Sequence, residues 1–532
     1  MPSRPREGSS TGIAVAEKVE AILASKGLSL YRASRQSIAL YGRPSLSFLP
    51  HNLYYDLRSG SFRPSAHQIF ALSRISGYRV ADWLRVFGFD LEDITRLQIL
   101  LPSKRTLVLD TSLTDPNVWI PWLRDRSLGS PVPSIAPLSR ILELGPRQPI
   151  ASVSQLDRYF VYAKIGGEDA LAFPDLVPGS IVRVSPDVTA DLMPKGNSAI
   201  SDRLFLVEHS KGFFCCRIRI LGGGVIVPFD SGLSYAQVEL HCPQEARVWG
   251  AVDLEFRPLL RGEQPEVPKD MARRWKPQPL PALGNFGQLL KRTRTRMNLS
   301  VREAAAKSRT IAEVLKDSRY ETSPSSLSEY ELGDAPPRDF HKIITLCSIY
   351  GLQFESVMKQ MGIDVAAAGT EAMPDRYVFR AEPGVGAKRS DAEVVGTRFL
   401  ETLLLKASQV IPFFLRDSLG YFSGSRRVSL DDFFWVGGED DALHPYLAEG
   451  LLVMVNRRRK TPLHRDSKPW WQQPLYIILM RDGSLLACCC AVENGLLVIH
   501  PYSRDFHHSA KYRLHQDAEV VGEIVAILRR LP

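Results

Sequence analysis

The chain lacks the cysteine patterns that stabilise small secreted domains or hold zinc. Its seven cysteines are an odd number, lie in hydrophobic runs and form no Cys-x-x-Cys pair or zinc-like spacing with histidine. This usage is typical of reduced, buried thiols in a cytoplasm. We therefore expect no disulfide framework, no metal and no cofactor.

Long apolar runs are also missing. No stretch reaches the roughly 18 residues that a membrane-spanning helix needs, and the polar N-terminus has no apolar signal region. Residues 1–12 are predicted to be a short disordered arm. With 44% hydrophobic and 23% charged residues, the sequence is typical of a soluble globular protein with no membrane partner, which we expect in a cytoplasm.

The charge is unbalanced toward the basic side. Lysine and arginine exceed aspartate and glutamate, which gives a formal net charge of +9. Clustered basic side chains displace counterions from phosphates, so this charge is compatible with a nucleic-acid partner. The signal is weak by itself, because many basic proteins bind no polyanion.

The sequence repeats itself at a spacing of 271 to 274 residues. A repeat of this length indicates duplication of a whole multidomain unit. The matched positions are Leu28-Ser29 with Leu299-Ser300, Gly60 with Gly333, Gly88 with Gly362, Gly-Gly-Glu-Asp at 166–169 with the same string at 437–440, and Val-Trp-Gly at 248–250 with Val-Val-Gly at 520–522.

Each repeat changes from helix-period sequence to strand-like sequence rich in valine, isoleucine and phenylalanine. The predicted fold class is α+β, with two all-α domains alternating with two β-rich domains. A proline-rich linker joins the repeats, since such a composition stays extended. The predicted segments are helical domains at 13–92 and 284–364, connecting segments at 93–150 and 365–407, β domains at 151–260 and 408–532, and the linker at 261–283.

Start and stop signals define the helices of the second repeat. A basic amphipathic helix is expected first. Ser300 with Glu303 forms a capping-box pattern that predicts the start of a second helix. Ser323 and Pro324 predict the start of a third helix, and Gly333 predicts its end.

This third segment resembles the recognition helix of the Cro/lambda-repressor-like (XRE-type) helix-turn-helix family. Residues 327–333 follow the family order, and Pro336 and Pro337 stand where a proline is expected. The resemblance implies a helix that presents short polar side chains to base edges in the major groove. The DNA-contact residues expected in this copy are Ser325, Ser326, Ser328 and Glu329, with Arg292 and Arg296 from the basic helix. The alternative is that the serines only cap and solvate the helix.

The first repeat shows the same plan with larger departures from the family. The recognition segment is 51–60, and its candidate DNA contacts are His51, Asn52, Tyr55 and Arg58. Asparagine can pair with adenine, and arginine with guanine or phosphate. Arg58 replaces the usual glutamate, and the preceding connection is longer than the family turn, as it is in the second repeat. A degenerate copy that does not bind DNA stays open.

The second half of each repeat resembles the C-terminal domain of LexA and phage CI repressors, a dimerising β-rich fold with a Ser/Lys peptidase dyad. The resemblance places Leu171 and Ala442 at the two nucleophile positions and Arg217 and Cys489 at the two base positions. None of these pairs can act as a Ser/Lys dyad, because the nucleophilic serine is absent and arginine stays protonated. We expect no enzyme activity. The family's closing strand, at 248–259 and 520–531, supports dimerisation, so we assign pairing to it.

The predicted function is therefore a sequence-specific, non-cleavable transcriptional regulator, a repressor whose two joined copies form a pseudo-dimer that recognises two different half-sites in double-stranded DNA. A homodimer through the β domains and a protein or small-ligand effector are further expected partners. The resemblance to repressors also implies a bacterial or phage-encoded protein that is cytoplasmic and associated with the nucleoid. The first alternative is an adaptor or antirepressor that pairs with LexA/CI-like repressors without binding DNA.

A second alternative is a protease with a displaced nucleophile, such as Cys489 with His444 or His500. The basic cluster at 457–460, followed by Trp470 and Trp471, suggests a further DNA contact. A simply solvated loop is the other interpretation of that cluster.

Overall fold

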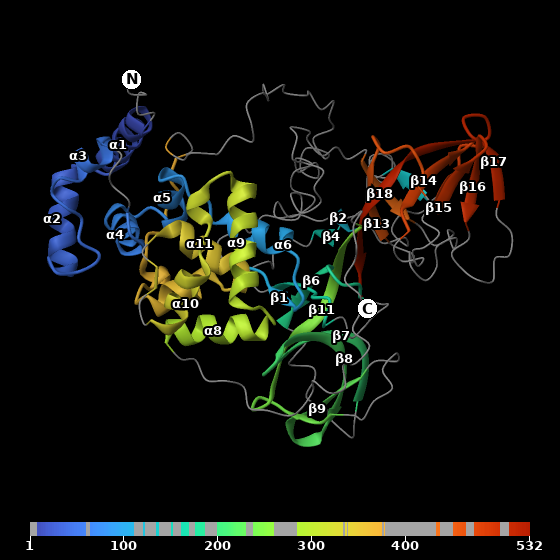
Figure 1. Ribbon diagram of the computed structural model, residues 1–532, viewed down its shortest axis with the longest axis horizontal. Coiled ribbons are helices and arrows are strands. Elements are labelled where there is room, and N and C mark those ends of the chain that lie inside the picture. Colours follow the sequence, from blue (N-terminus) through green and yellow to red (C-terminus); the bar gives the residue numbers. More distant parts are fainter. Residues whose placement is uncertain are drawn as a thin grey trace. The chain divides into compact units, whose positions relative to one another are not determined.

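The computed structural model describes residues 8–59, 64–110, 121–122, 135–137, 151–152, 161–169, 176–186, 199–229, 238–259, 285–333, 336–337, 339–374, 377, 432–436, 451–463, 473–500 and 510–531. The chain divides into a helical unit, comprising Met1–Leu101, Leu109–Thr114 and Ala282–Val385, and a sheet unit comprising Pro102–Val108, Asp115–Pro281 and Gly386–Pro532. Helices and antiparallel strands thus alternate along the chain, which confirms the α+β class (Figure 1). In the described part, no helix has the length and apolarity needed to cross a membrane.

Among the described residues, the first repeat contributes five helices and a sixth that follows them. Val19, Ile22 and Leu23 are buried and form the apolar stripe of the first helix. Because that helix begins at Gly8, residues 8–12 belong to it and not to the expected arm; residues 1–7 lie outside the described part. The bounds are α1 (Gly8–Ala24), α2 (Leu30–Tyr41), α3 (Leu53–Arg58), α4 (Ala66–Ser76), α5 (Val80–Val86) and α6 (Glu92–Leu100).

The second repeat contributes a matching group of five helices. The predicted capping box is confirmed, since Ser300 Oγ accepts from Glu303 N and the Glu303 carboxylate accepts from Ser300 N. Ser323 caps the third helix with Pro324 in its first turn, and Gly333 ends it, as expected. The bounds are α8 (Phe286–Arg296), α9 (Val301–Leu315), the 3-10 turn η6 (Ser318–Tyr320), α10 (Pro324–Leu332), α11 (Phe340–Tyr350), α12 (Phe354–Gln360) and the 3-10 turn η7 (Val365–Ala367).

The segment after the first group packs on the second group. Helix α6 lies against α11, where Gln98 Nε2 donates to the carbonyl of Cys347 at 3.1 Å. Asp110 Oδ2 accepts from the backbone N–H of Phe354 at 2.6 Å, at the start of α12. Both polar contacts are buried, so water does not compete for them.

The segment after the second group packs on the first in return. Glu371 pairs with the backbone of Gly77 and Arg79 just before α5, and the buried Asp82 carboxylate accepts from Met373 N at 3.0 Å. Each group therefore receives the chain that leaves the other, at the N-terminal end of its fifth helix. We call this arrangement the reciprocal tie.

Gly369 is the tightest point of the reciprocal tie. A Cβ at this position would lie 2.3 Å from the backbone of Gly77 and 2.5 Å from the carbonyl oxygen of Tyr78. Since both obstacles are backbone, we expect Gly369→Ala to destabilise the helical unit by about 1–3 kcal/mol. Thermal unfolding should show a lower Tm than for the control Ala367→Ser, which changes an exposed neighbour. Equal Tm values for the two variants would contradict this packing.

The sheet unit is built from antiparallel strands. Its main path in the described part runs β10-β9-β8-β7-β11-β18-β14-β15-β16-β17. The bounds are β1 (Leu107–Val108), β2 (Pro121–Trp122), β3 (Ile135–Pro137), β4 (Ala151–Ser152), β5 (Val161–Lys164), β6 (Ile181–Ser185), β7 (Ala199–His209), β8 (Gly212–Leu221), β9 (Val225–Phe229), β10 (Leu240–His241), β11 (Ala246–Pro258), β12 (Phe433–Val436), β13 (Leu451–Asn456), β14 (Leu475–Met480), β15 (Leu485–Glu493), β16 (Leu496–His500), β17 (Ala510–Arg513) and β18 (Ala518–Arg530).

The strand order is the same in both repeats. The first has β5-β6-β11-β7-β8-β9 and the second has β12-β13-β18-β14-β15-β16. The glycine of each Val-x-Gly string lies against the backbone of a neighbouring strand. A Cβ on Gly250 would lie 2.2 Å from the carbonyl oxygen of Ser185, and one on Gly522 would lie 2.6 Å from that of Asn456. Only a residue without a side chain fits this close approach.

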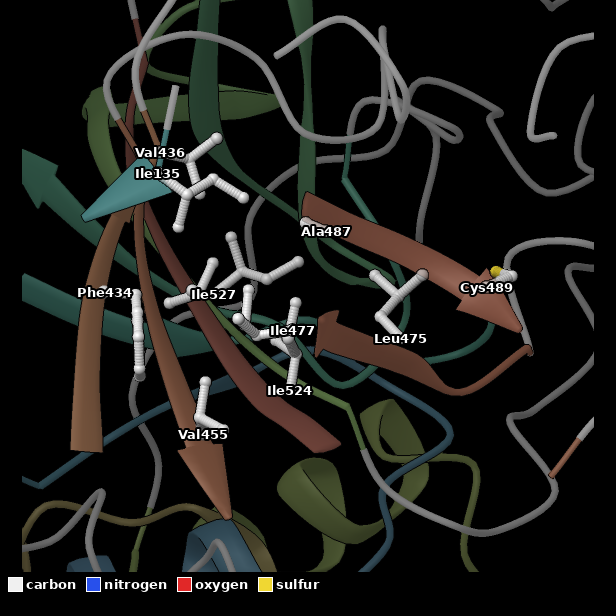
Figure 2. Packing of buried hydrophobic residues seen from close by; sticks show 11 residues of the cluster. Ile135, Phe434, Val436, Val455, Leu475, Ile477, Ala487, Cys489, Ile524 and Ile527 are labelled. Atoms are coloured by element: carbon white, nitrogen blue, oxygen red, sulfur yellow. The ribbon is translucent and has the colours of Figure 1, made fainter. Parts of the chain in front are cut away.

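One strand of the second β part comes from the first repeat. In the first repeat, β5 pairs with β1. In the second repeat, the strand that corresponds to β5 is β12, and it pairs with β3, which lies in the first connecting segment. Ile135 of β3 lies beside Val436 in the hydrophobic core of the second β part (Figure 2). The connecting segment at 93–150 therefore contributes both a helix and core strands.

The closing strands of the two repeats pair with each other. Phe256 of β11 lies opposite Leu528 of β18, and these residues are 272 positions apart, so equivalent positions meet. The pairing is centred on this point and extends from Leu254 with Arg530 to Pro258 with Ala526. A contact between equivalent positions has the form of a twofold dimer interface, here made within one chain.

A buried charge cluster accompanies this pairing. Glu255 is fully buried and binds Arg257 Nε at 3.0 Å and Arg529 Nε at 2.5 Å, and it accepts from Ser180 Oγ at 2.7 Å. The two arginines hold equivalent positions of the repeats. One carboxylate therefore links the closing strands of both.

Candidate nucleic-acid interface

Helix α10 carries the candidate contacts of the second repeat. Ser325 and Glu329 are exposed, and Ser326 and Ser328 are half-buried. Ser323 Oγ, the cap, lies 2.8 Å from Ser325 Oγ and 3.0 Å from Ser326 Oγ. Three hydroxyl groups thus gather at the N-terminal end of the helix, where a helix approaching a major groove would present them.

A buried ion pair fixes α10 against its neighbours. Arg294 of α8 binds the Glu331 carboxylate through two nitrogens at 2.6 and 2.8 Å and donates to the carbonyl of Leu299 at 2.9 Å. Tyr350 Oη of α11 donates to Glu331 at 3.4 Å. Sequence reasoning assigned no role to Glu331 beyond the family pattern. Because Glu331 lies inside that pattern, its role in positioning α10 was not recognised from the sequence.

The two basic candidates of α8 differ in exposure. Arg292 is exposed and Arg296 is half-buried, and each has an interaction with another group. Both lie on the side of α8 away from buried Phe286 and Leu290. They stay predicted DNA contacts.

Helix α3 carries the candidates of the first repeat, but it is shorter than the predicted segment 51–60. It starts at Leu53, and Asn52 is its N-cap, with Nδ2 donating to Asp56 at 3.2 Å. His51 precedes the helix, and Tyr55 is 74% exposed. Arg58 is exposed and its guanidinium donates to Tyr54 Oη at 3.1 Å.

The connections before both helices are long, as the sequence indicates. Eleven residues separate α2 from α3, and eight residues that include η6 separate α9 from α10. In the first repeat, the Arg294–Glu331 pair has no counterpart. The equivalent of Glu331 is Arg58, and the equivalent of Arg294 falls at the fully buried Ile22 or Leu23. The equivalent of Arg294 is thus a buried apolar residue, and Arg58 is exposed.

The positions that correspond to the peptidase dyad differ in what can be described. Leu171 and Ala442 lie outside the described residues. Arg217 is half-buried on β8, opposite Leu204 and Phe229. No chemistry follows from Arg217, because a protonated guanidinium cannot accept a proton.

Cys489 is a core residue. It is 5% exposed among apolar side chains such as Leu475 and Ala487 (Figure 2). Burial, reinforced by Cys490, raises the pKa of Cys489 to about 12. His500 lies directly opposite on β16, but a thiol that stays protonated is a poor nucleophile. These observations weigh against the displaced-nucleophile alternative; His444 lies outside the described residues.

The basic cluster at 457–460 has acidic partners. Arg459 lies 3.3 Å from the buried Glu523, Lys460 lies 3.1 Å from Glu519, and Arg457 stacks over Phe434. These contacts favour a structural role over phosphate binding. Trp470 and Trp471 lie outside the described residues.

Comparisons with known proteins add little. No family model matches the chain, and no curated protein matches it. Among solved structures, the chain is similar at 12% identity to Streptomyces albus HEPD, which was solved with 2-hydroxyethylphosphonate and Fe(II) bound; the match covers 98% of this chain and 92% of that chain with a TM-score of 0.12. A likeness this weak carries no argument about fold or function.

Proposed function

We propose that this protein is a sequence-specific DNA-binding regulator, a repressor that recognises two different half-sites through α3 and α10. Each helix would act as the recognition helix of a Cro/lambda-repressor-like helix-turn-helix domain. The reciprocal tie is the observation that carries the proposal, because it holds two helical groups of the same plan in one unit. A fixed pair of recognition elements is what a two-part operator requires.

The proposal extends to the β parts, which we infer to be LexA/CI-like domains that keep a dimerising role and lack peptidase activity. The pairing of β11 with β18 supports this role, since it joins equivalent strands. It also supports DNA binding over the adaptor alternative, because an adaptor would need this closing strand for a partner. A homodimer would have to use another strand, and a ligand or protein effector would supply control in place of self-cleavage.

Selection from a random duplex pool tests the function, with fluorescence-anisotropy measurement of the selected DNA. We expect enrichment of a motif with two dissimilar halves and an affinity that falls with salt. Ser325→Ala/Ser328→Ala should relax one half and Asn52→Ala/Arg58→Ala the other, each weakening binding by about 1–3 kcal/mol per lost base contact. Glu313→Ala, an exposed change on α9, serves as the control. Absence of any enriched motif would favour the adaptor.

A further inference from the structure

The first helical group displays an ordered aromatic surface next to its recognition helix. Tyr31, in the first turn of α2, is 61% exposed, and its ring stacks on His51 with centroids 6.2 Å apart. His51 is itself held by Ser34 Oγ at 3.1 Å from Nδ1 and by the edge of Phe48. The Tyr31 ring is therefore held by His51 while more than half of the residue stays exposed.

A second exposed ring lies on α3. Tyr55 packs edge-on against Tyr54 at 5.8 Å, and Tyr54 is held by Arg58. An exposed tyrosine that is already oriented loses little conformational entropy on binding. Tyr31 precedes His51 in the sequence and Tyr55 follows it. Each presents an exposed ring that is already oriented by its neighbours.

The charge around these rings suits DNA. Arg32, Arg35 and Arg43 are exposed, and within the described residues no acidic side chain pairs with them. Near α10, two exposed arginines are instead paired with carboxylates of the same group. Arg309 binds Glu321 at 3.0 Å, and Arg319 binds Asp317 at 2.6 Å.

The Asp317 carboxylate stays charged in that pair, because the Arg319 hydrogen bond lowers the pKa of Asp317 to about 2. Arg32, Arg35 and Arg43 differ in this respect from Arg309 and Arg319, because no carboxylate in the described residues competes with a phosphate for them.

We propose that the first helical group recognises thymine through its C5 methyl group, with Tyr31 and Tyr55 as the contacting rings and Arg32, Arg35 and Arg43 on the flanking phosphates. This inference rests on the proposed DNA-binding function and specifies its ligand. The thymine methyl is the apolar group that base edges offer in the major groove, so an apolar ring face distinguishes thymine from the other bases. Tyr31 and Tyr55 would thereby be specificity-determining residues of the first half-site.

Replacing thymine by deoxyuridine tests this inference, because it removes the methyl group and keeps every hydrogen-bonding group. The probe is the selected duplex with uracil placed in one half-site at a time, and anisotropy with the full chain gives Kd. We expect uracil in the first half-site to weaken wild-type binding about fivefold per methyl, and uracil in the second to have no effect. Tyr31→Ala/Tyr55→Ala should bind the thymine and uracil duplexes equally.

Two controls separate this inference from folding and from the function itself. Leu40→Ala removes an exposed apolar residue on the opposite side of α2 and should keep the thymine preference. Tyr31→Phe/Tyr55→Phe should also keep it, since the rings remain. Thymine recognition would be overturned if wild type bound both duplexes equally, or if only the phenylalanine variants lost the thymine preference. Either result would leave DNA binding intact. If the selection instead yields no duplex that the protein binds, the proposed function itself is refuted.

Discussion

Glu255→Ala is expected to lower the free energy of unfolding by about 3–5 kcal/mol, the largest loss among the substitutions considered. The carboxylate is fully buried, and its removal leaves Arg257 and Arg529 without their shared counter-charge. Full hydration of the buried Arg257 and the partly buried Arg529 guanidinium groups requires the closing strands to separate. Urea denaturation at neutral pH measures the effect.

Acid should reveal the same cluster in the unmodified protein. Burial alone would raise the pKa of Glu255, but Arg257 and Arg529 outweigh burial and lower the pKa below its ordinary 4.5. A carboxyl group with a lowered pKa stabilises the fold above its unfolded-state pKa, and the stabilisation is lost as pH falls through the folded-state value. Wild type should therefore lose more stability than Glu255→Gln below about pH 4.5.

The matched control is Glu519→Ala on the same strand β18. Glu519 and Lys460 are both about half exposed, and an exposed pair contributes at most about 1 kcal/mol. If Glu255→Ala were no more destabilising than Glu519→Ala, the buried cluster would not hold the closing strands together.

Glu331→Ala is expected to weaken both the helical unit and recognition of the second half-site. The side chain is 5% exposed and accepts two hydrogen bonds from Arg294, so its removal should cost about 2–3 kcal/mol of stability. Loss of the pair frees α10 from α8, and we expect Kd for the second half-site to rise roughly tenfold, which corresponds to 1.4 kcal/mol. Chemical denaturation and anisotropy on the selected duplex measure the two effects.

Two comparisons define the role of Glu331 as positioning. Glu331→Gln keeps the shape and one acceptor, and it should recover part of the affinity. Glu313→Ala removes an exposed carboxylate from α9 and should change neither stability nor Kd. An affinity loss for Glu331→Ala that extends equally to the first half-site would indicate general unfolding instead of local misplacement of α10.

Local signals predicted the helices of the second repeat well. The Ser300 capping box, the Ser323 cap with Pro324 and the stop at Gly333 depend on atoms within four residues, so sequence suffices to find them. In the first repeat the recognition helix is shorter than expected. No comparable cap starts it, since the Asn52 side chain bonds Asp56 and not a backbone N–H of the first turn.

The candidate contacts could be only partly predicted for a related reason. Tyr55 and Arg58 were found because they lie inside the recognition segment. Tyr31 lies 20 residues upstream of His51, on another helix, and its stacking on His51 became visible only in the folded chain.

The sequence by itself determined the repeat, the alternation of helical and strand-rich segments and the caps of individual helices, because these depend on residue type and short-range spacing. The tertiary structure decided the reciprocal tie, the docking of β3 in the second β part and the pairing of Glu255 with Arg529. Each of these joins residues hundreds of positions apart, where burial and hydrogen-bond geometry select the partner. No local sequence pattern indicates which long-range partner is selected.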